Sequence, residues 1–153
     1  MNRTSRYSDI VSNMNDYFYH ILGCGAIGSS AATQLCRMGA EHFVLYDLDK
    51  VETANIGVSQ YGHSHLGQNK TTALNSLLMD INPQCEITEM TEYFQTFMYS
   101  NEKDIIILGF DSMKSRLDAV ETLLSESPRN DHRYTVQHCQ LTTPEQYERI
   151  ASL

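Results

Sequence analysis

Apolar residues along the chain form short continuous runs that alternate with longer stretches in which they recur every three or four positions. The short runs predict buried β-strands, and the recurring pattern predicts helices. We expect strands at 17–22, 42–46, 85–88 and 104–108, and helices at 26–38, 66–81 and 112–124. Weaker patterns predict a helix at 93–98, a strand at 134–138 and a helix at 144–153. Strands that alternate with helices indicate βαβ units around a mostly parallel sheet, which is an α/β fold.

Some elements carry more specific expectations. In the helix at 26–38 the apolar residues at helical spacing are Ile27, Ala31, Leu35 and Met38. In the helix at 112–124 the residues that share one face are Leu117, Val120, Leu123 and Leu124. The run at 104–108 is the clearest candidate for a buried strand. The segment at 48–66 is too long for a simple turn, which favours a functional or partly helical segment.

Composition excludes several classes of function. The formal net charge of −8 argues against nucleic acid or an anionic membrane as partner, since both require clustered basic residues. No apolar run approaches the roughly 18 to 20 residues of a membrane span, and the polar N-terminus does not read as a signal peptide. The four cysteines are widely spaced and form no C-x-x-C pair. We therefore expect reduced thiols in a cytoplasmic protein.

A glycine-rich turn follows the first predicted strand and opens the first predicted helix. In this run, at 23–28, Gly23 permits a tight turn, Gly25 lets a phosphate approach the backbone and Gly28 allows close packing of helix and strand. A phosphate held there would meet free N–H groups and the positive end of the helix dipole. Asp47, at the end of the next strand, suits ribose hydroxyls. These features fit a nicotinamide dehydrogenase as well as an ATP-binding protein.

Further polar residues follow at the ends of later elements. They are Asp49 and Asn55 after the second strand, Lys70 near the start of the second long helix, and Asp111 after the run at 104–108. Ligands of open α/β sheets bind outside the carboxyl ends of the strands. We therefore expect these side chains near the glycine turn. Arg116 could steer a phosphate or carboxylate, or lie on the surface.

This series resembles the ThiF/MoeB-type adenylyltransferases, the superfamily that includes the activating enzymes of ubiquitin and related carrier proteins. The residues that match the family pattern are Gly23, Gly25, Gly28, Asp47, Asp49, Val51, Asn55, Ile56, Gly67, Lys70, Asn82-Pro83 and Asp111. They keep the family's order and approximate spacing between Tyr17 and Leu124. The resemblance implies a Rossmann-like, doubly wound sheet with flanking helices, truncated relative to the family. The single ThiF-like nucleotide-binding domain would comprise an N-terminal arm at 1–16, a core at 17–126 and a tail at 127–153.

The resemblance also implies a reaction, in which ATP adenylylates the C-terminal carboxylate of a small ubiquitin-like or sulfur-carrier protein. By position, the glycine turn with Asp47, Asp49, Asn55, Lys70 and Asp111 would bind the nucleotide. Asp47 would hold the ribose, Asn55 and Lys70 would contact the phosphates, and Asp111 would bind Mg²⁺ through ATP. Lys70 and Asp111 would be the catalytic residues, because a cation pair stabilises the charge that builds on the equatorial oxygens. The resemblance further implies a homodimer.

The chain departs from the family at two arginine positions, which hold Val58 and Asp9. It also lacks the family's later strands and its zinc-binding Cys-x-x-Cys pair. Whether the chain is an enzyme is therefore left open at this stage. One alternative is a catalytically weak or inactive module of the same fold that binds nucleotide and docks a partner. A second is an NAD-dependent oxidoreductase.

Overall fold

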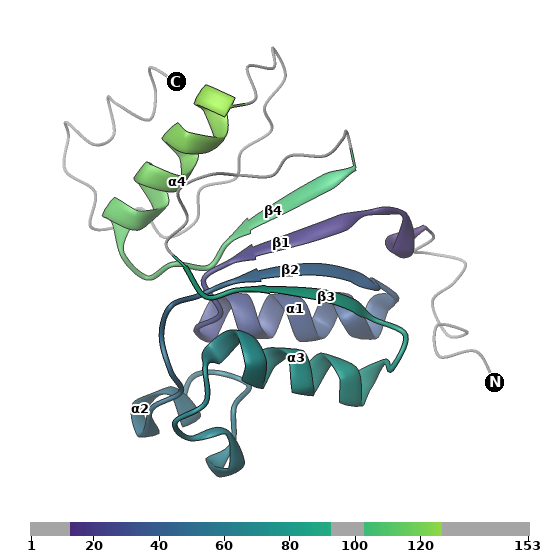
Figure 1. The fold of residues 1–153 in the computed structure, drawn as a ribbon, viewed down its shortest axis with the longest axis vertical. Coiled ribbons are helices and arrows are strands. Elements are labelled where there is room, and N and C mark those ends of the chain that lie inside the picture. The colour runs from purple at the N-terminus through teal and green to yellow at the C-terminus, as the bar shows by residue number, and fades with distance from the viewer. Residues whose placement is uncertain (1–12, 93–102, 127–153) are drawn as a thin grey trace.

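A computed structural model describes residues 13–92 and 103–126 of the chain and centres on a parallel sheet. The strands are β1 (Phe18–Leu22), β2 (His42–Tyr46), β3 (Glu86–Met90) and β4 (Asp104–Leu108). They lie in the order β3-β2-β1-β4, and every pair in that order is parallel. The order reverses direction at β1, so the gap between the ends of β1 and β4 is the switch point where ligands bind in such sheets. Figure 1 shows this arrangement.

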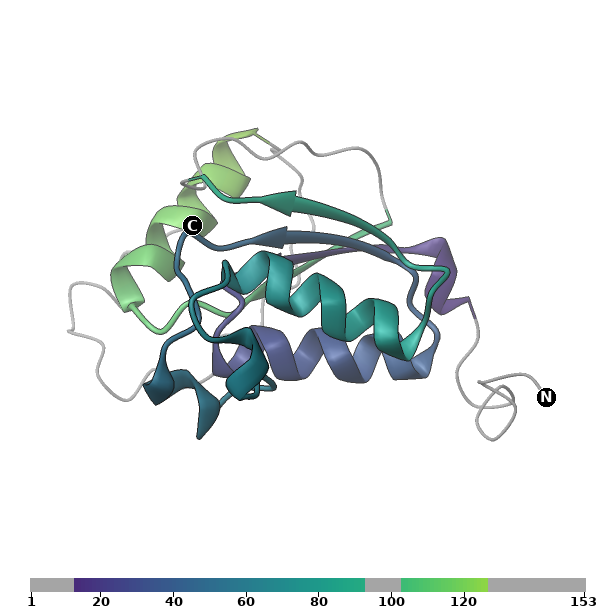
Figure 2. The ribbon, with the colours of Figure 1, turned by 60° about the horizontal axis from the view of Figure 1, so that its bottom comes forward.

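The helices cover both faces of the sheet, as a doubly wound fold requires. α1 (Ala26–Met38) and α3 (Lys70–Ile81) lie against one face, and α4 (Met113–Glu126) lies on the other side (Figures 1 and 2). A short α2 (Thr53–Ile56) lies between β2 and α3, and single 3-10 turns occupy Met14–Asp16 and His63–His65. The predicted α/β, Rossmann-like fold is confirmed, and the segment at 48–66 is partly helical as expected.

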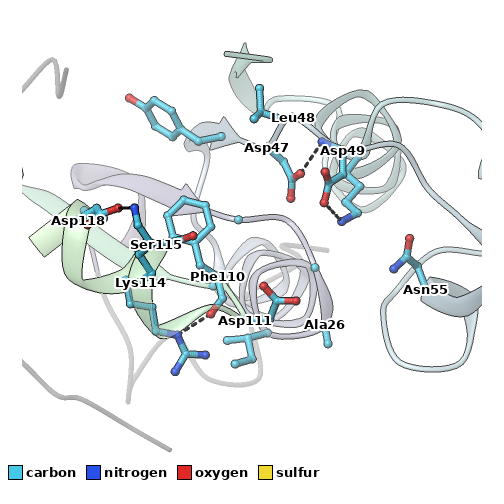
Figure 3. A pocket seen from close by; sticks show the side chains of 18 of the residues that line it. Ala26, Asp47, Leu48, Asp49, Asn55, Phe110, Asp111, Lys114, Ser115 and Asp118 are labelled. Atoms are coloured by element: carbon cyan, nitrogen blue, oxygen red, sulfur yellow. Dashed lines mark hydrogen bonds and ion pairs between the residues drawn. The ribbon is translucent and has the colours of Figure 1, made fainter. Parts of the chain in front are cut away.

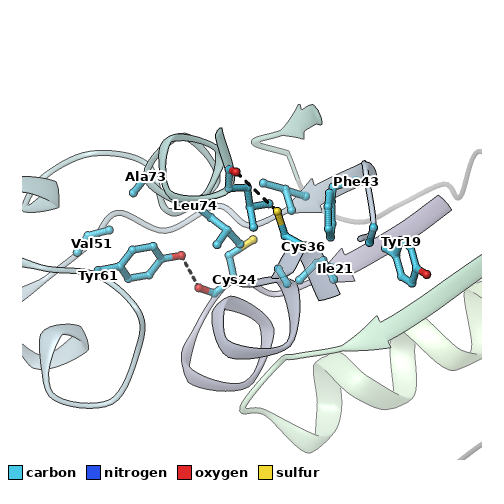
Figure 4. Packing of buried hydrophobic residues seen from close by; sticks show 13 residues of the cluster. Tyr19, Ile21, Cys24, Cys36, Phe43, Val51, Tyr61, Ala73 and Leu74 are labelled. Atoms are coloured by element: carbon cyan, nitrogen blue, oxygen red, sulfur yellow. Dashed lines mark hydrogen bonds between the residues drawn. The ribbon is translucent and has the colours of Figure 1, made fainter. Parts of the chain in front are cut away.

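Two apolar clusters hold these layers together. The larger cluster lies between the sheet and the pair α1–α3, and includes Tyr19, Ile21, Phe43, Leu45 and Leu74 (Figure 4). The smaller cluster joins Leu22 and Tyr46 of the sheet to Ala119 and Leu123 of α4. Alternate residues of β1 therefore serve different clusters, because successive side chains of a strand point to opposite faces.

The inward face of α1 matches the predicted one only in part, since Leu35 packs against the larger cluster. Ile27 and Met38 are 44% and 37% exposed. The buried residues of the helix are Gly28, Ser29, Ala32, Thr33 and Cys36. Small residues face the sheet because α1 approaches the end of β1 closely, and bulky side chains would not fit there. On α4, Leu117 and Leu123 are buried as expected, but Ala119 replaces Val120 on the inner face.

Some element boundaries and the burial of one strand also differ from the predictions. The second long helix begins at Lys70 and not at 66, because Gly67 has a positive φ and Lys50 pairs with Asn69 in an isolated bridge. The third strand runs from Glu86 to Met90 instead of 85–88. β4 is only partly buried, with Ile105 37% exposed. The elements predicted at 93–98, 134–138 and 144–153 lie outside the described residues, as do Asp9, most of the proposed arm and all of the proposed tail.

Candidate nucleotide-binding site

A cavity of about 680 Å³ opens at the carboxyl ends of β1, β2 and β4 (Figure 3). Its volume falls within the range of small-molecule sites. Residues from all the predicted site segments line it, and these include Gly23, Gly25, Asp47, Asp49, Asn55, Lys70 and Asp111. Sequence positions almost ninety residues apart are therefore brought to one place. Gly28 does not line the cavity and instead packs against the Gly23 carbonyl.

The glycine turn is packed too tightly for any side chain at two positions. Gly23 has a φ of 93°, a conformation that favours glycine. A Cβ on Gly28 would lie 1.8 Å from the carbonyl oxygen of Gly23, which explains the close contact between α1 and the turn. By contrast, a Cβ on Gly25 would meet no atom within 4 Å, because that position faces the open cavity. The tight turn predicted at Gly23 and the close packing predicted at Gly28 are therefore confirmed, whereas the phosphate contact predicted at Gly25 stays a prediction.

The amino end of α1 points its first N–H groups toward this cavity. Gly25 is the N-cap residue and has no side chain, so no side chain caps the helix there. Ala26 and Ile27 line the cavity beside it. Unpaired amide donors and the helix dipole together favour an anion at this point.

Asp47 ties the end of β2 to the turn. One carboxylate oxygen accepts a hydrogen bond from the Cys24 N–H at 2.7 Å, and the other accepts one from the Asp49 N–H at 2.8 Å. Burial raises the pKa of this carboxyl, while the two backbone hydrogen bonds and Lys70 act in the opposite direction. A carboxylate has about four lone-pair sites, so Asp47 keeps acceptor capacity for a ribose hydroxyl.

Lys70 lines the cavity together with the glycine turn, and it is only 8% exposed. Its ammonium group donates to Asp49 Oδ2 at 2.8 Å (Figure 3). Burial lowers the pKa of Lys70, but the hydrogen bond to Asp49 and the charges of Asp47, Asp49 and Asp111 outweigh it, so the net shift is upward. The lysine is therefore charged at neutral pH, and carboxylates outnumber it locally.

Asn55 and Asp111 both line the cavity. The Asn55 side-chain oxygen accepts a hydrogen bond from the Glu52 N–H at 2.8 Å, which leaves its NH₂ group to donate. The side chain that caps α4 is Ser112, whose hydroxyl accepts from the Ser115 N–H at 3.3 Å. Asp111 is therefore not consumed as a helix cap, which the sequence alone could not decide.

Several residues of the site were not singled out by the sequence. Gly109 packs against the turn, since a Cβ there would lie 2.3 Å from the Gly23 carbonyl oxygen. Phe110, whose carbonyl accepts a hydrogen bond from Arg116, and Leu48 line the cavity. Tyr61 lies behind the turn and donates to the Cys24 carbonyl. Of these residues, only Gly109 could have been predicted from the sequence, because a glycine directly after a strand indicates a turn or a close backbone approach.

Val58 occupies the cavity wall where the resemblance would place an arginine, and it is 66% exposed. Among residues 13–92 and 103–126, the cationic residues that line the cavity are Lys70, Lys114 and Arg116. Lys114 is paired with Asp118 at 2.6 Å on the exposed face of α4.

The remaining chemistry-bearing side chains form no second centre within the described ranges. Cys24, Cys36 and Cys85 form no disulfide with one another. No group of His, Cys, Asp or Glu in this part of the chain is arranged to hold a metal by itself. His65 instead accepts the Gly62 N–H and stacks edge-on against Tyr61. Across residues 13–92 and 103–126, no helix has the length and apolarity needed to cross a membrane.

Comparison with known proteins supports the same interpretation. Residues 8–127 match the sequence model described as "ThiF family". The chain is 34% identical over 98 residues to ubiquitin-like modifier-activating enzyme 5 of Oryza sativa subsp. japonica, which covers 60% of this chain and 23% of that protein. It is 31% identical over 104 residues to tRNA threonylcarbamoyladenosine dehydratase of Bacillus subtilis, covering 67% of this chain and 39% of that protein. The chain thus spans well under half the length of these relatives.

A solved structure shares the fold. A crystal structure of E. coli MccB with ATP superimposes with a TM-score of 0.68 at 22% identity, over 82% of this chain and 41% of that one. At that identity the likeness establishes the architecture alone. The described sheet and helices therefore share the architecture of one part of a longer protein, and the likeness assigns no residue.

Proposed function

The chain belongs to the ThiF family, and from this premise we propose that it binds Mg-ATP and adenylylates the C-terminal carboxylate of a small ubiquitin-like or sulfur-carrier protein. The single observation that carries the proposal is Lys70, a nearly buried cation that faces the same cavity as the glycine turn. A buried ammonium beside free helix N–H groups suits the phosphates of a nucleotide. An adenylation-type activity is also the feature that the family relatives support in general.

In this proposal each residue acts from the position described above. The amides of Gly25 and Ala26 bind a phosphate, and Asp47 accepts the ribose hydroxyls. The NH₂ group of Asn55 and the ammonium group of Lys70 donate to phosphate oxygens. The carrier's carboxylate oxygen attacks the α-phosphorus, the bond to the bridging oxygen breaks, and pyrophosphate leaves with the electron pair. The donors stabilise the charge on the equatorial oxygens during this step.

Asp111 would hold Mg²⁺, which suits a site that offers one carboxylate together with substrate phosphates. Bound there, Mg²⁺ would neutralise phosphate charge. The donor set fits this ion because Asp111 is exposed to the cavity and not consumed by capping. The excess of carboxylates around Lys70 favours the magnesium complex over free ATP, since each carboxylate repels an unneutralised triphosphate.

Val58 favours a second candidate, a module that binds nucleotide and docks a partner without turnover. An arginine at this position would add a charge-assisted contact to the triphosphate. A valine with 66% of its surface exposed supplies none. Each hydrogen bond to a charged group is worth about 1.5 to 3 kcal/mol. The loss of one such contact leaves the other contacts to the nucleotide in place, so it slows turnover more readily than it abolishes binding. The two candidates therefore differ in turnover and agree on the binding site.

Calorimetric titration with ATP, AMP and NAD, with and without Mg²⁺, tests the binding step. We expect Mg-ATP to bind and Lys70→Ala to weaken it by tenfold or more, since a charge-assisted contact is lost. The matched control is Lys103→Ala, a half-exposed lysine near Asp16 and away from the cavity. Absence of Mg-ATP binding at millimolar nucleotide would overturn the proposal, and micromolar NADH binding in its place would favour the oxidoreductase.

Exchange of labelled pyrophosphate into ATP then separates the enzyme from the module. Carrier-dependent exchange would support adenylylation, and binding without exchange would support docking alone. We further propose a cytoplasmic homodimer, because the family resemblance implies one. Sedimentation of the full chain checks its oligomeric state.

A further inference from the structure

Tyr61 has a position that the proposed reaction does not yet use. It is 3% exposed and belongs to the large core cluster together with Cys24, Val51 and Leu74 (Figure 4). Its hydroxyl donates to the Cys24 carbonyl oxygen at 2.6 Å and lies 3.2 Å from the Lys70 carbonyl oxygen. One buried phenol therefore contacts both the glycine turn and the first residue of α3.

The Cys24 carbonyl belongs to the same peptide group as the Gly25 N–H. A trans peptide is planar, and its C=O and N–H point in opposite directions. A hydrogen bond that holds the carbonyl toward the core must therefore aim the Gly25 N–H away from the core. Gly25 lines the cavity, and its N–H makes no backbone hydrogen bond to another described residue.

The same hydrogen bond also strengthens the donor. A hydrogen bond accepted by a carbonyl polarises its peptide group, and hydrogen bonds in a chain reinforce one another. Tyr61 itself is well held for this task. Burial raises the pKa of its hydroxyl, with the Coulombic influence of Cys24 and Asp47 acting in the same direction, so the group stays protonated and donating. Its ring stacks edge-on against His65, at a centroid distance of 6.1 Å.

We propose that Tyr61 is a positioning residue for phosphate binding: its hydroxyl orients and polarises the Gly25 amide and links the turn to the helix that carries Lys70. This inference rests on the proposed nucleotide site. Tyr61 does not line the cavity and would act on the nucleotide only through these backbone groups.

Tyr61→Phe removes the hydroxyl and keeps the ring. The matched control is Tyr19→Phe, because Tyr19 is also buried and its hydroxyl donates to a backbone carbonyl, that of Met14, at the far end of β1. Two readouts on the full chain separate positioning from general stability. One is the Kd for Mg-ATP compared with the Kd for adenosine, which has no phosphate. The other is the ¹⁵N and ¹H shift of the Gly25 amide without nucleotide.

We expect Tyr61→Phe to raise the Kd for Mg-ATP by about five- to tenfold, the effect of one lost hydrogen bond. The Kd for adenosine should stay within about twofold of the wild-type value. The Gly25 amide shift should move in this variant and stay fixed in Tyr19→Phe. Unchanged Mg-ATP affinity, or an equal loss for Mg-ATP and adenosine, would overturn the proposal.

Two further results keep the outcome decisive. If the wild-type chain binds no nucleotide, the proposed function fails, and the Gly25 shift alone then decides whether Tyr61 orients that amide. If Tyr61→Phe does not fold, the wild-type spectrum decides instead. Mg-ATP must then shift the Gly25 amide, and an unmoved Gly25 signal on saturation would contradict the role.

Discussion

Substitution of Gly28 by alanine tests the packing on which the site depends. The new Cβ would lie 1.8 Å from the Gly23 carbonyl oxygen, whereas contacts below 3.0 Å are essentially never observed. The Gly23 carbonyl cannot move aside, because Gly109 packs against the same oxygen. Gly109 is itself held in place, since its N–H donates a hydrogen bond to the Leu22 carbonyl oxygen. Overpacking lowers the free energy of unfolding by about 1 to 3 kcal/mol and occasionally more. Because backbone atoms on both sides prevent relaxation, we expect a loss of about 3 kcal/mol or more for this variant.

For a chain of this size, 1 kcal/mol lowers the Tm by about 2–4 °C, so we expect a fall of roughly 6–12 °C in a thermal melt followed by circular dichroism. The matched control is Gly57→Ala. Gly57 has helical backbone angles, and a Cβ there meets no atom within 4 Å. Alanine at 57 should be neutral or stabilise by up to about 1 kcal/mol. A Gly28→Ala variant that melts with the wild type would refute the close contact between helix and turn.

The remaining predictions concern ligand, metal, cap and pH. Gly25→Ala should leave the Tm within about 2 °C, because no atom crowds that position, yet weaken Mg-ATP by tenfold or more in calorimetry, since the methyl group occupies the phosphate position. Removal of Mg²⁺ with EDTA should lower the affinity for ATP by about tenfold or more, because carboxylates outnumber Lys70 at the site. Equal affinity with and without Mg²⁺ would contradict this electrostatic explanation. Ser112→Ala should cost about 1 kcal/mol in urea denaturation through loss of the α4 cap, whereas Asp111→Asn should spare stability and reduce Mg-ATP affinity. Burial raises the pKa of Tyr19 from 10.0 to about 12, so the folded chain keeps this proton after the unfolded chain has lost it. Stability should therefore fall between about pH 10 and pH 12, with a shallower fall in Tyr19→Phe.

Much of the fold could be predicted because its signals are local. Strand and helix periodicity located the four strands and the three long helices. Gly39 ends α1 in a left-handed conformation, which glycine adopts more readily than other residues. The face of α1 was predicted only in part, because periodicity favours large apolar residues: Leu35 packs against the core, but Ile27 is exposed. The true inner face has small residues, a choice set by the distance to the sheet, and this distance cannot be read from one helix.

The site could be predicted only as a set of residues. The sequence series indicated Asp47, Lys70 and Asp111, and the structure brings all of them to one cavity. It could not indicate the partners that orient them, such as Asp49 for Lys70 or Tyr61 for the turn. Those contacts join positions 21 and 37 residues apart, and they follow from the tertiary arrangement.

The central claim is that the cavity at the glycine turn binds the phosphates of Mg-ATP. The position of the phosphorus atoms in a crystal of the full chain with Mg²⁺ and a non-hydrolysable ATP analogue tests it most directly. The account predicts a phosphate against the Gly25 and Ala26 amides, with the Lys70 ammonium group donating to a phosphate oxygen. A nucleotide bound elsewhere on the molecule, or phosphates that touch neither the turn nor Lys70, would contradict it.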